Sequence, residues 1–92
     1  MNSPSAIFNW DDENIRHLAR HTVSPDEAEQ CYRNDPLIVE EQLVRGELRY
    51  LAMGETNASR RLAFVFTIRH GRVRFVTAYP MTHQQQEMYE EG

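Results

Sequence analysis

Residues 62–78 read LAFVFTIRHGRVRFVTA, and this stretch decides the fold. Apolar side chains occupy every second position from Leu62 to Ile68, which is the spacing of one face of a β-strand. The dipeptide HG at residues 70–71 is a two-residue loop of the kind that joins antiparallel strands. Apolar residues resume at once behind this loop, so the stretch predicts a β-hairpin whose return strand runs to Ala78.

A two-residue loop also fixes which residues of the two strands lie opposite each other. It places Phe66 opposite Phe75 and Ile68 opposite Val73 on one face of the hairpin. Four large apolar side chains on one face of a strand pair predict that this face is buried. We therefore expect the core of the protein to lie against these residues.

The opposite face of the same hairpin carries positive charge. Arg69 lies directly opposite Arg72, and Thr67 lies opposite Arg74. Like charges directly opposite destabilise a sheet by up to about 1 kcal/mol. Three explanations are open at this point: a solvated hairpin tip with splayed side chains screened by salt, an acidic surface on this chain or on a partner, or a nucleic-acid phosphate.

Two helices are expected before the hairpin and one after it. Asp11 can cap the first helix, and SPDE at residues 24–27 is a capping box with proline at the first helical position. THQQ at residues 82–85 repeats the capping pattern, so a C-terminal helix is expected to run from there to about Glu90.

The remaining strands are less regular in sequence. Residues 6–10 are a short strand candidate, and residues 37–39 are a short apolar run followed by a polar connection through Gly46. Residues 48–54 carry apolar side chains on both faces, which is typical of a central strand. Together these elements predict a small α+β domain with a mostly antiparallel sheet. It spans residues 1–92, of which 1–5 are expected to be flexible.

Charge is distributed unevenly along the chain. Residues 1–55 contain eleven Asp and Glu against five Arg, whereas residues 57–85 contain five Arg and no acid. The whole chain has a net charge of −4, and all ten of its basic residues are arginine. A basic segment in an acidic chain favours a polyanionic partner or pairing with the acidic part.

Several classes of protein are excluded or disfavoured by composition. The single cysteine, Cys31, allows no intrachain disulfide. No apolar run approaches the roughly 20 residues that span a bilayer, and the N-terminus lacks a signal-peptide pattern. His17 and His21 have a spacing that can hold a metal, but no further ligands accompany them. We expect a cytoplasmic protein that contacts no membrane and needs neither metal nor cofactor.

Short motifs along most of the chain resemble those of one protein family. The matching segments are WDDENI at 10–15, ARH at 19–21, VSPDEA at 23–28, RYLAMGET at 49–56, LAFVFTIR at 62–69, GRVR at 71–74, TA at 77–78, MT at 81–82 and YEE at 89–91. Their order and spacing resemble the BrnT family of toxins.

The resemblance implies a RelE-like fold and membership of a type II toxin–antitoxin pair. A toxin of this kind is expected to be an endoribonuclease that inhibits translation. Its partner is expected to be a cognate antitoxin with a DNA-binding domain, so that promoter DNA is contacted only through the antitoxin. The chain differs from the family pattern at Tyr79, where an arginine is common, and at residues 83–86, which are HQQQ rather than basic.

RNA cleavage without a metal needs a base for the 2′-hydroxyl, cations at the reacting phosphate and an acid for the leaving oxygen. We expect Arg49 and Arg74 to stabilise the phosphate, because guanidinium groups bind it bidentately. Glu55 or His83 is the candidate base or acid, and Tyr79 is a neutral donor. The residues expected to hold flanking RNA are Arg60, Arg61, Arg69 and Arg72.

An alternative hypothesis keeps the fold without the chemistry. In it the chain is a catalytically degenerate binding module that engages only an antitoxin or another regulatory partner. Direct DNA binding by this chain is disfavoured, because its helices begin with acidic residues and show no basic recognition stripe.

Overall fold

The computed structural model describes residues 7–92 and confirms the predicted α+β class. The elements in chain order are α1 (Asp12–Ala19), α2 (Pro25–Arg33), β1 (Leu37–Val44), β2 (Glu47–Glu55), β3 (Arg61–Arg69), β4 (Arg72–Pro80) and α3 (His83–Glu91). The flexibility predicted for residues 1–5 lies outside the described residues.

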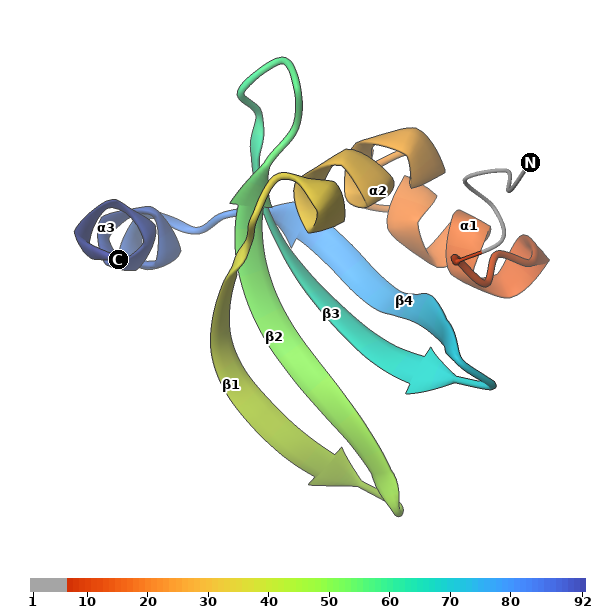
Figure 1. Cartoon of the computed structure of the whole chain (residues 1–92). Helices are drawn as coiled ribbons and strands as arrows, with labels where there is room; N and C mark the ends of the chain where they lie inside the picture. Colours follow the sequence, from red (N-terminus) through yellow and green to blue (C-terminus); the bar gives the residue numbers. More distant parts are fainter. Residues whose placement is uncertain (1–6) are drawn as a thin grey trace.

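The four strands form one antiparallel meander in the order β1-β2-β3-β4 (Figure 1). The predicted hairpin register is confirmed, since Phe66 pairs with Phe75 and Thr67 pairs with Arg74. Further along, Val65 pairs with Thr77, so Val76 is an extra residue on β4. A β-bulge of this kind bends an edge strand and increases its twist.

The predicted helix starts are confirmed at all three helices. Asp11, Ser24 and Thr82 each accept a hydrogen bond from the backbone N–H three residues later, and each helix has a complete capping box. These side chains satisfy N–H groups that have no partner inside the helix. The start of each helix is therefore set by local sequence.

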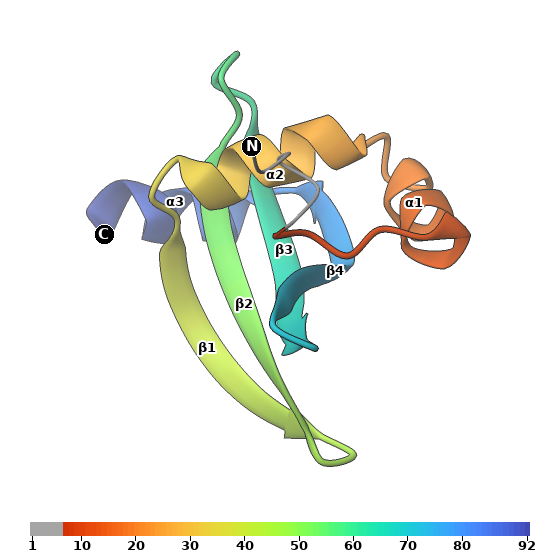
Figure 2. The ribbon, with the colours of Figure 1, turned by 45° about the vertical axis from the view of Figure 1, so that its right-hand side comes forward.

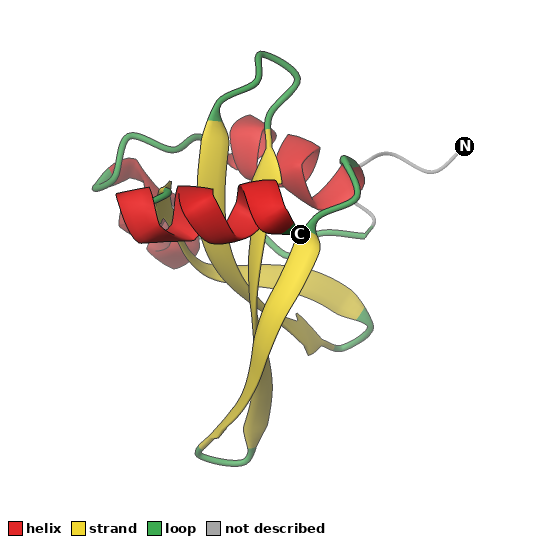
Figure 3. Cartoon of the chain, turned by 90° about the vertical axis from the view of Figure 1, so that its left-hand side faces the viewer, coloured by secondary structure: helices red, strands yellow, loops and turns green. Residues whose placement is uncertain are grey.

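The two faces of the sheet are covered by different helices (Figure 2). On the face under α2, a core of aromatic side chains surrounds Phe75, whose ring stacks on those of Phe8 and Trp10. On the opposite face, α3 closes a smaller cluster around Met53 and Met81. Figure 3 shows α3 lying across one end of the sheet, so the other end of this face has no helix over it.

Strand β1 is longer than the sequence predicts. The residues expected to form a polar connection belong to the strand, and the connection to β2 is only Arg45 and Gly46, both with positive φ. The prediction failed because β1 is an edge strand whose side chains are mostly exposed. Backbone pairing with β2 does not require apolar residues there.

Two further expectations are corrected. The strand candidate at residues 6–10 is reduced to one parallel bridge between Phe8 and Val73, and Ala6 lies outside the described residues. Ile68 was expected in the core but is 51% exposed, because it lies near the end of β3, beyond the buried aromatic cluster.

Truncation of Phe75 tests where the core lies. We expect Phe75→Ala to lower the free energy of unfolding by about 3–4 kcal/mol, because its fully buried ring contacts four other aromatic rings. Leu43→Ala is the matched control, since this side chain is 75% exposed. Urea unfolding followed by circular dichroism measures both; equal losses in the two variants would contradict this description of the core.

Candidate functional site

A row of side chains crosses the face of the sheet that α3 leaves open. Arg49 of β2 pairs with Thr67 of β3, and Thr67 pairs with Arg74 of β4, so the three residues lie side by side on neighbouring strands. Successive residues of a strand alternate between its two faces, which places Arg69 on the same face as Thr67. Antiparallel pairing thus gathers three arginines that are distant in sequence.

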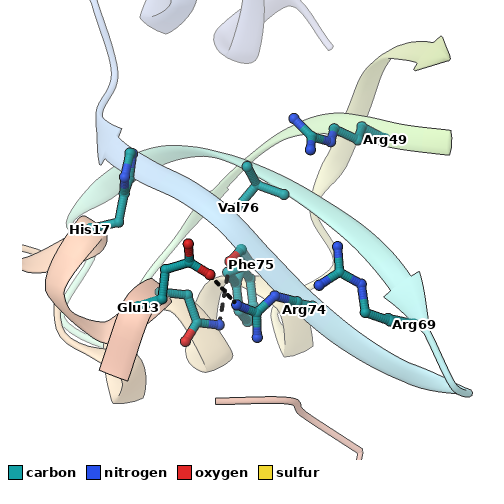
Figure 4. A pocket seen from close by; sticks show the side chains of 8 residues that line it. Glu13, His17, Arg49, Arg69, Arg74, Phe75 and Val76 are labelled. Carbon is teal, nitrogen blue, oxygen red and sulfur yellow. Dashed lines mark hydrogen bonds and ion pairs between the residues drawn. The ribbon is translucent and has the colours of Figure 1, made fainter. Parts of the chain in front are cut away.

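Helix α1 completes this site from the edge of the sheet. The bridge between Phe8 and Val73 lays the segment before α1 alongside β4, and Figure 4 shows α1 facing the arginines across a cavity. The cavity has a volume of about 330 Å³. It is lined by Glu13, Asn14, His17, Arg49, Arg69, Arg74, Phe75 and Val76.

Arg74 is buried at the start of α1, and both of its terminal nitrogens have partners there. Its side chain is 8% exposed, with Nη1 3.0 Å from Asp11 Oδ2 and Nη2 3.3 Å from Glu13 Oε1. Nη1 also donates to the side-chain oxygen of Asn9 at 3.2 Å. The hydrogen bond from Arg74 lowers the pKa of Asp11, which is also the N-cap of α1. Arg74 therefore fastens the start of the helix to the sheet.

Arg49 and Arg69 share one carboxylate. Arg49 Nε lies 3.0 Å from Glu47 Oε1, and Arg69 Nη2 lies 2.6 Å from Glu47 Oε2. Hydrogen bonds from Arg69 and then Arg49 lower the pKa of Glu47, and Glu47 in turn raises the pKa of Arg69. Both guanidinium groups are partly exposed, so they can meet a ligand that enters the cavity.

Glu55 and Arg61, two of the predicted site residues, lie at the other end of the sheet. Arg61 Nε is 3.1 Å from Glu55, and its Nη1 is 2.7 Å from Glu90 of α3. Glu90, followed by Glu55, raises the pKa of Arg61. Glu55 is six positions beyond Arg49 on β2, which is about 20 Å along a strand. The structure thus does not bring Glu55 to the predicted arginine pair.

Tyr79 and His83 also lie apart from that pair. The Tyr79 hydroxyl accepts a hydrogen bond from Gln85 at 3.1 Å, and its ring lies 6.1 Å from that of His21. His83 begins α3 with a side chain that is 91% exposed and is 3.5 Å from Glu87. The predicted catalytic residues therefore fall into separate groups rather than one site.

The two remaining predicted RNA-binding residues differ from each other. Arg60 forms a salt bridge of 3.0 Å with Glu27 and donates to the backbone oxygen of Thr22 at 2.8 Å, which ties the β2–β3 loop to the turn before α2. Arg72 is exposed at the hairpin tip and has no ion pair with any of residues 7–92.

In the folded chain, most arginines of the basic segment are therefore paired with carboxylates of the acidic segment. Of the three explanations for the basic hairpin face, an acidic surface on the same chain accounts for Arg69 and Arg74. Glu13 and Glu47, which pair with these arginines, are not predicted by the sequence, and the spacing of His17 from His21 indicates only a metal ligand. The sequence does hold one indication that Glu13 and His17 line the same site, because they are four apart on α1 and so share a face of that helix.

The described residues support neither a metal site, nor a reactive cysteine, nor a membrane-spanning helix. No cluster of three or more His, Cys, Asp and Glu residues within 7–92 is placed to hold a metal ion. Burial raises the pKa of Cys31 to about 12, so its thiol stays protonated and unreactive. No helix in this region has the length and apolar character needed to cross a membrane.

Comparison with protein families decides the relationship. Residues 10–85 match the family described as the ribonuclease toxin, BrnT, of type II toxin–antitoxin systems. The chain belongs to the BrnT family. The match includes the whole cavity and every predicted site residue, and membership implies a cognate antitoxin. A search among curated proteins gave no match.

Replacement of Arg74 tests its structural role. We expect Arg74→Met to lower the free energy of unfolding at pH 7 by about 2 kcal/mol, because it removes a buried charge that holds two carboxylates. Arg72→Met, at an exposed position two residues earlier, is the control and should change stability little.

The loss of stability in Arg74→Met should also depend on pH. The folded-state pKa of Asp11 is lowered from 3.8, so its contribution is present above about pH 4 and is lost as the pH falls through the folded-state value. Urea unfolding of parent and Arg74→Met should therefore give a stability difference that narrows below about pH 4. A difference that is constant from pH 7 to pH 3 would show that the ion pair is not its source.

Proposed function

We propose that this BrnT-family chain is a metal-independent endoribonuclease that inhibits translation and acts on RNA bound in the cavity between α1 and the sheet. One observation carries the proposal: two partly exposed guanidinium groups, those of Arg49 and Arg69, line a cavity whose opposite wall holds the imidazole of His17 (Figure 4). Transesterification of RNA by its own 2′-hydroxyl needs cations at the phosphate and proton transfer, and these side chains supply two cations and one proton-transfer group.

In this proposal each cavity residue has a distinct task. Arg49 and Arg69 bind the reacting phosphate and stabilise the charge that develops on its oxygens, which is usually the largest catalytic contribution. His17 takes the proton of the attacking 2′-hydroxyl and passes it to the leaving 5′-oxygen as the P–O5′ bond breaks, since imidazole is the side chain most often used for proton transfer near neutral pH. Arg74 is a positioning residue, because its contacts with Asp11 and Glu13 hold α1 and hence His17 at the cavity.

The other sequence-predicted residues keep narrower roles. Arg72 extends the positive surface at the hairpin tip and is placed to meet a flanking phosphate. Arg60 and Arg61 are engaged by carboxylates of the chain, and RNA binding by either stays a prediction. The same holds for catalysis by Glu55, Tyr79 or His83, and for direct contact of Arg74 with RNA.

The partners follow from family membership. We propose a cognate antitoxin that carries a DNA-binding domain and neutralises the toxin, so that promoter DNA is bound only through the antitoxin. The described helices support this division, because α2 begins with acidic residues and α3 has no basic residue in its last turn. An enzyme that acts on messenger or ribosomal RNA is expected to work in the cytoplasm.

Substitution in the cavity tests the enzyme. We expect Arg49→Gln to lower the rate of RNA cleavage about 100-fold, the usual cost of losing one donor to a transition-state oxyanion. His17→Asn should lower it by about 100-fold or more, because proton transfer is lost. Arg33→Gln removes the same charge from α2 on the other face of the sheet and should leave the rate within a few-fold of the parent.

The assay uses purified chain and total RNA in the presence of a chelator, together with growth of bacteria that express each variant. Cleavage that survives chelation and falls only in the cavity variants supports the proposal. Equal cleavage by parent and Arg49→Gln would contradict the assignment. Normal growth and intact RNA with folded parent protein would instead favour the catalytically degenerate binding module.

A further inference from the structure

Glu47 occupies the place between two arginines that a phosphate group would take. Its two carboxylate oxygens each meet one guanidinium group, Oε1 that of Arg49 at 3.0 Å and Oε2 that of Arg69 at 2.6 Å. A carboxylate and a phosphodiester both present oxygen pairs that match the guanidinium fork. Glu47 is thus an internal anion held at the phosphate-binding arginines.

The position of Glu47 is set by the backbone rather than by these contacts. It is the first residue of β2 and follows the two-residue turn of Arg45 and Gly46, in which both residues have positive φ. It also pairs with Val44 of β1. The main chain therefore stays in place if the carboxylate leaves the arginines, and only the side chain needs to turn.

The contacts of Glu47 are open to exchange, unlike those of Arg74. The side chains of Glu47, Arg49 and Arg69 are 25%, 32% and 42% exposed, whereas that of Arg74 is 8% exposed. Each of the two arginines uses a single nitrogen for Glu47, and within residues 7–92 their other guanidinium nitrogens donate to no protein group. Ion pairs that are this exposed contribute little and are exchanged easily.

We propose that Glu47 is an internal competitor for RNA, whose phosphodiester displaces the Glu47 carboxylate from Arg49 and Arg69 on binding. This inference rests on the proposed function, because it assumes that RNA phosphate enters the same cavity. In the free protein Glu47 offsets one of the two positive charges of Arg49 and Arg69, and it lowers the affinity for any phosphate that does not bring further contacts. Glu47 therefore sets the affinity of the site for phosphate and its selectivity for RNA over anions that make no further contacts.

Removal of the Glu47 charge tests the competition. The probe is a short fluorescein-labelled 2′-O-methyl RNA, which lacks the free 2′-hydroxyl and so reports binding without cleavage. We expect Glu47→Gln to bind it about three- to tenfold more tightly than the parent, since two exposed ion pairs no longer have to be broken. The affinity should also fall more steeply with salt, because more protein charge is free to release counterions.

Glu41→Gln is the matched control. Glu41 is exposed on β1 opposite Tyr50, on the other face of the same hairpin, and its loss changes the net charge by the same amount. Tighter binding by Glu47→Gln than by Glu41→Gln supports the competition. Equal affinities of the two variants would assign the effect to net charge and overturn the competition. Weaker binding by Glu47→Gln than by the parent would also overturn it, and would show that Glu47 orients the arginines instead.

Cleavage of unmodified RNA separates this inference from the proposed function. A parent chain that cleaves RNA, with a Glu47→Gln variant that binds the probe no more tightly, overturns the competition alone. If neither protein binds the probe or inorganic phosphate, and neither cleaves RNA, both proposals fail together. Unfolding curves for each variant show whether a loss reflects misfolding.

Discussion

The buried guanidinium group of Arg74 is the contact on which the rest of the site depends. It joins the first part of the edge strand β4 to Asp11 and Glu13 at the start of α1, and Asp11 is at the same time the cap of that helix. A buried charge that loses its partners is costly, so the ion pair and the helix cap support each other. Because α1 is fixed here, Glu13 and His17 line the cavity beside the arginines, and α1 adds a wall to the open face of the sheet.

The arginines of this BrnT-family chain divide by what they already contact. Arg74, Arg60 and Arg61 each join two elements that are distant in sequence, and each is held by carboxylates of the chain. Arg49 and Arg69 instead share a single, partly exposed carboxylate and line the cavity. A chain with a net charge of −4 can thus use three arginines to join its elements and still keep two at the proposed phosphate site. This division explains why an acidic protein is compatible with a ribonuclease family.

The sequence predicts the local structure of the chain well and its long-range charge pairing poorly. The register of the β3–β4 hairpin and the three helix caps follow from residues within a few positions of each other, and these predictions are confirmed. The extent of β1 was missed because an exposed edge strand needs no apolar pattern. Composition does not identify the carboxylates that meet Arg74, because it does not say that α1 lies beside β4, and the partner of Arg69 depends on the pairing of β2 with β3. The predicted grouping of Glu55 with Arg49 fails because the two lie about 20 Å apart along β2, and that of His83 with Arg74 fails because His83 follows the far end of β4.

The most direct test of this division is to follow the arginine side chains themselves. Nuclear magnetic resonance of the ¹⁵N-labelled chain resolves individual guanidinium Nε–H signals, which can be assigned by substitution and followed while a 2′-O-methyl RNA is added. We predict that the signals of Arg49 and Arg69 shift on binding, while those of Arg60, Arg61 and Arg74 stay where they are. Shifts of Arg74 or Arg61 with unchanged Arg49 and Arg69 would contradict the account, and would place the RNA on residues that it assigns to the fold.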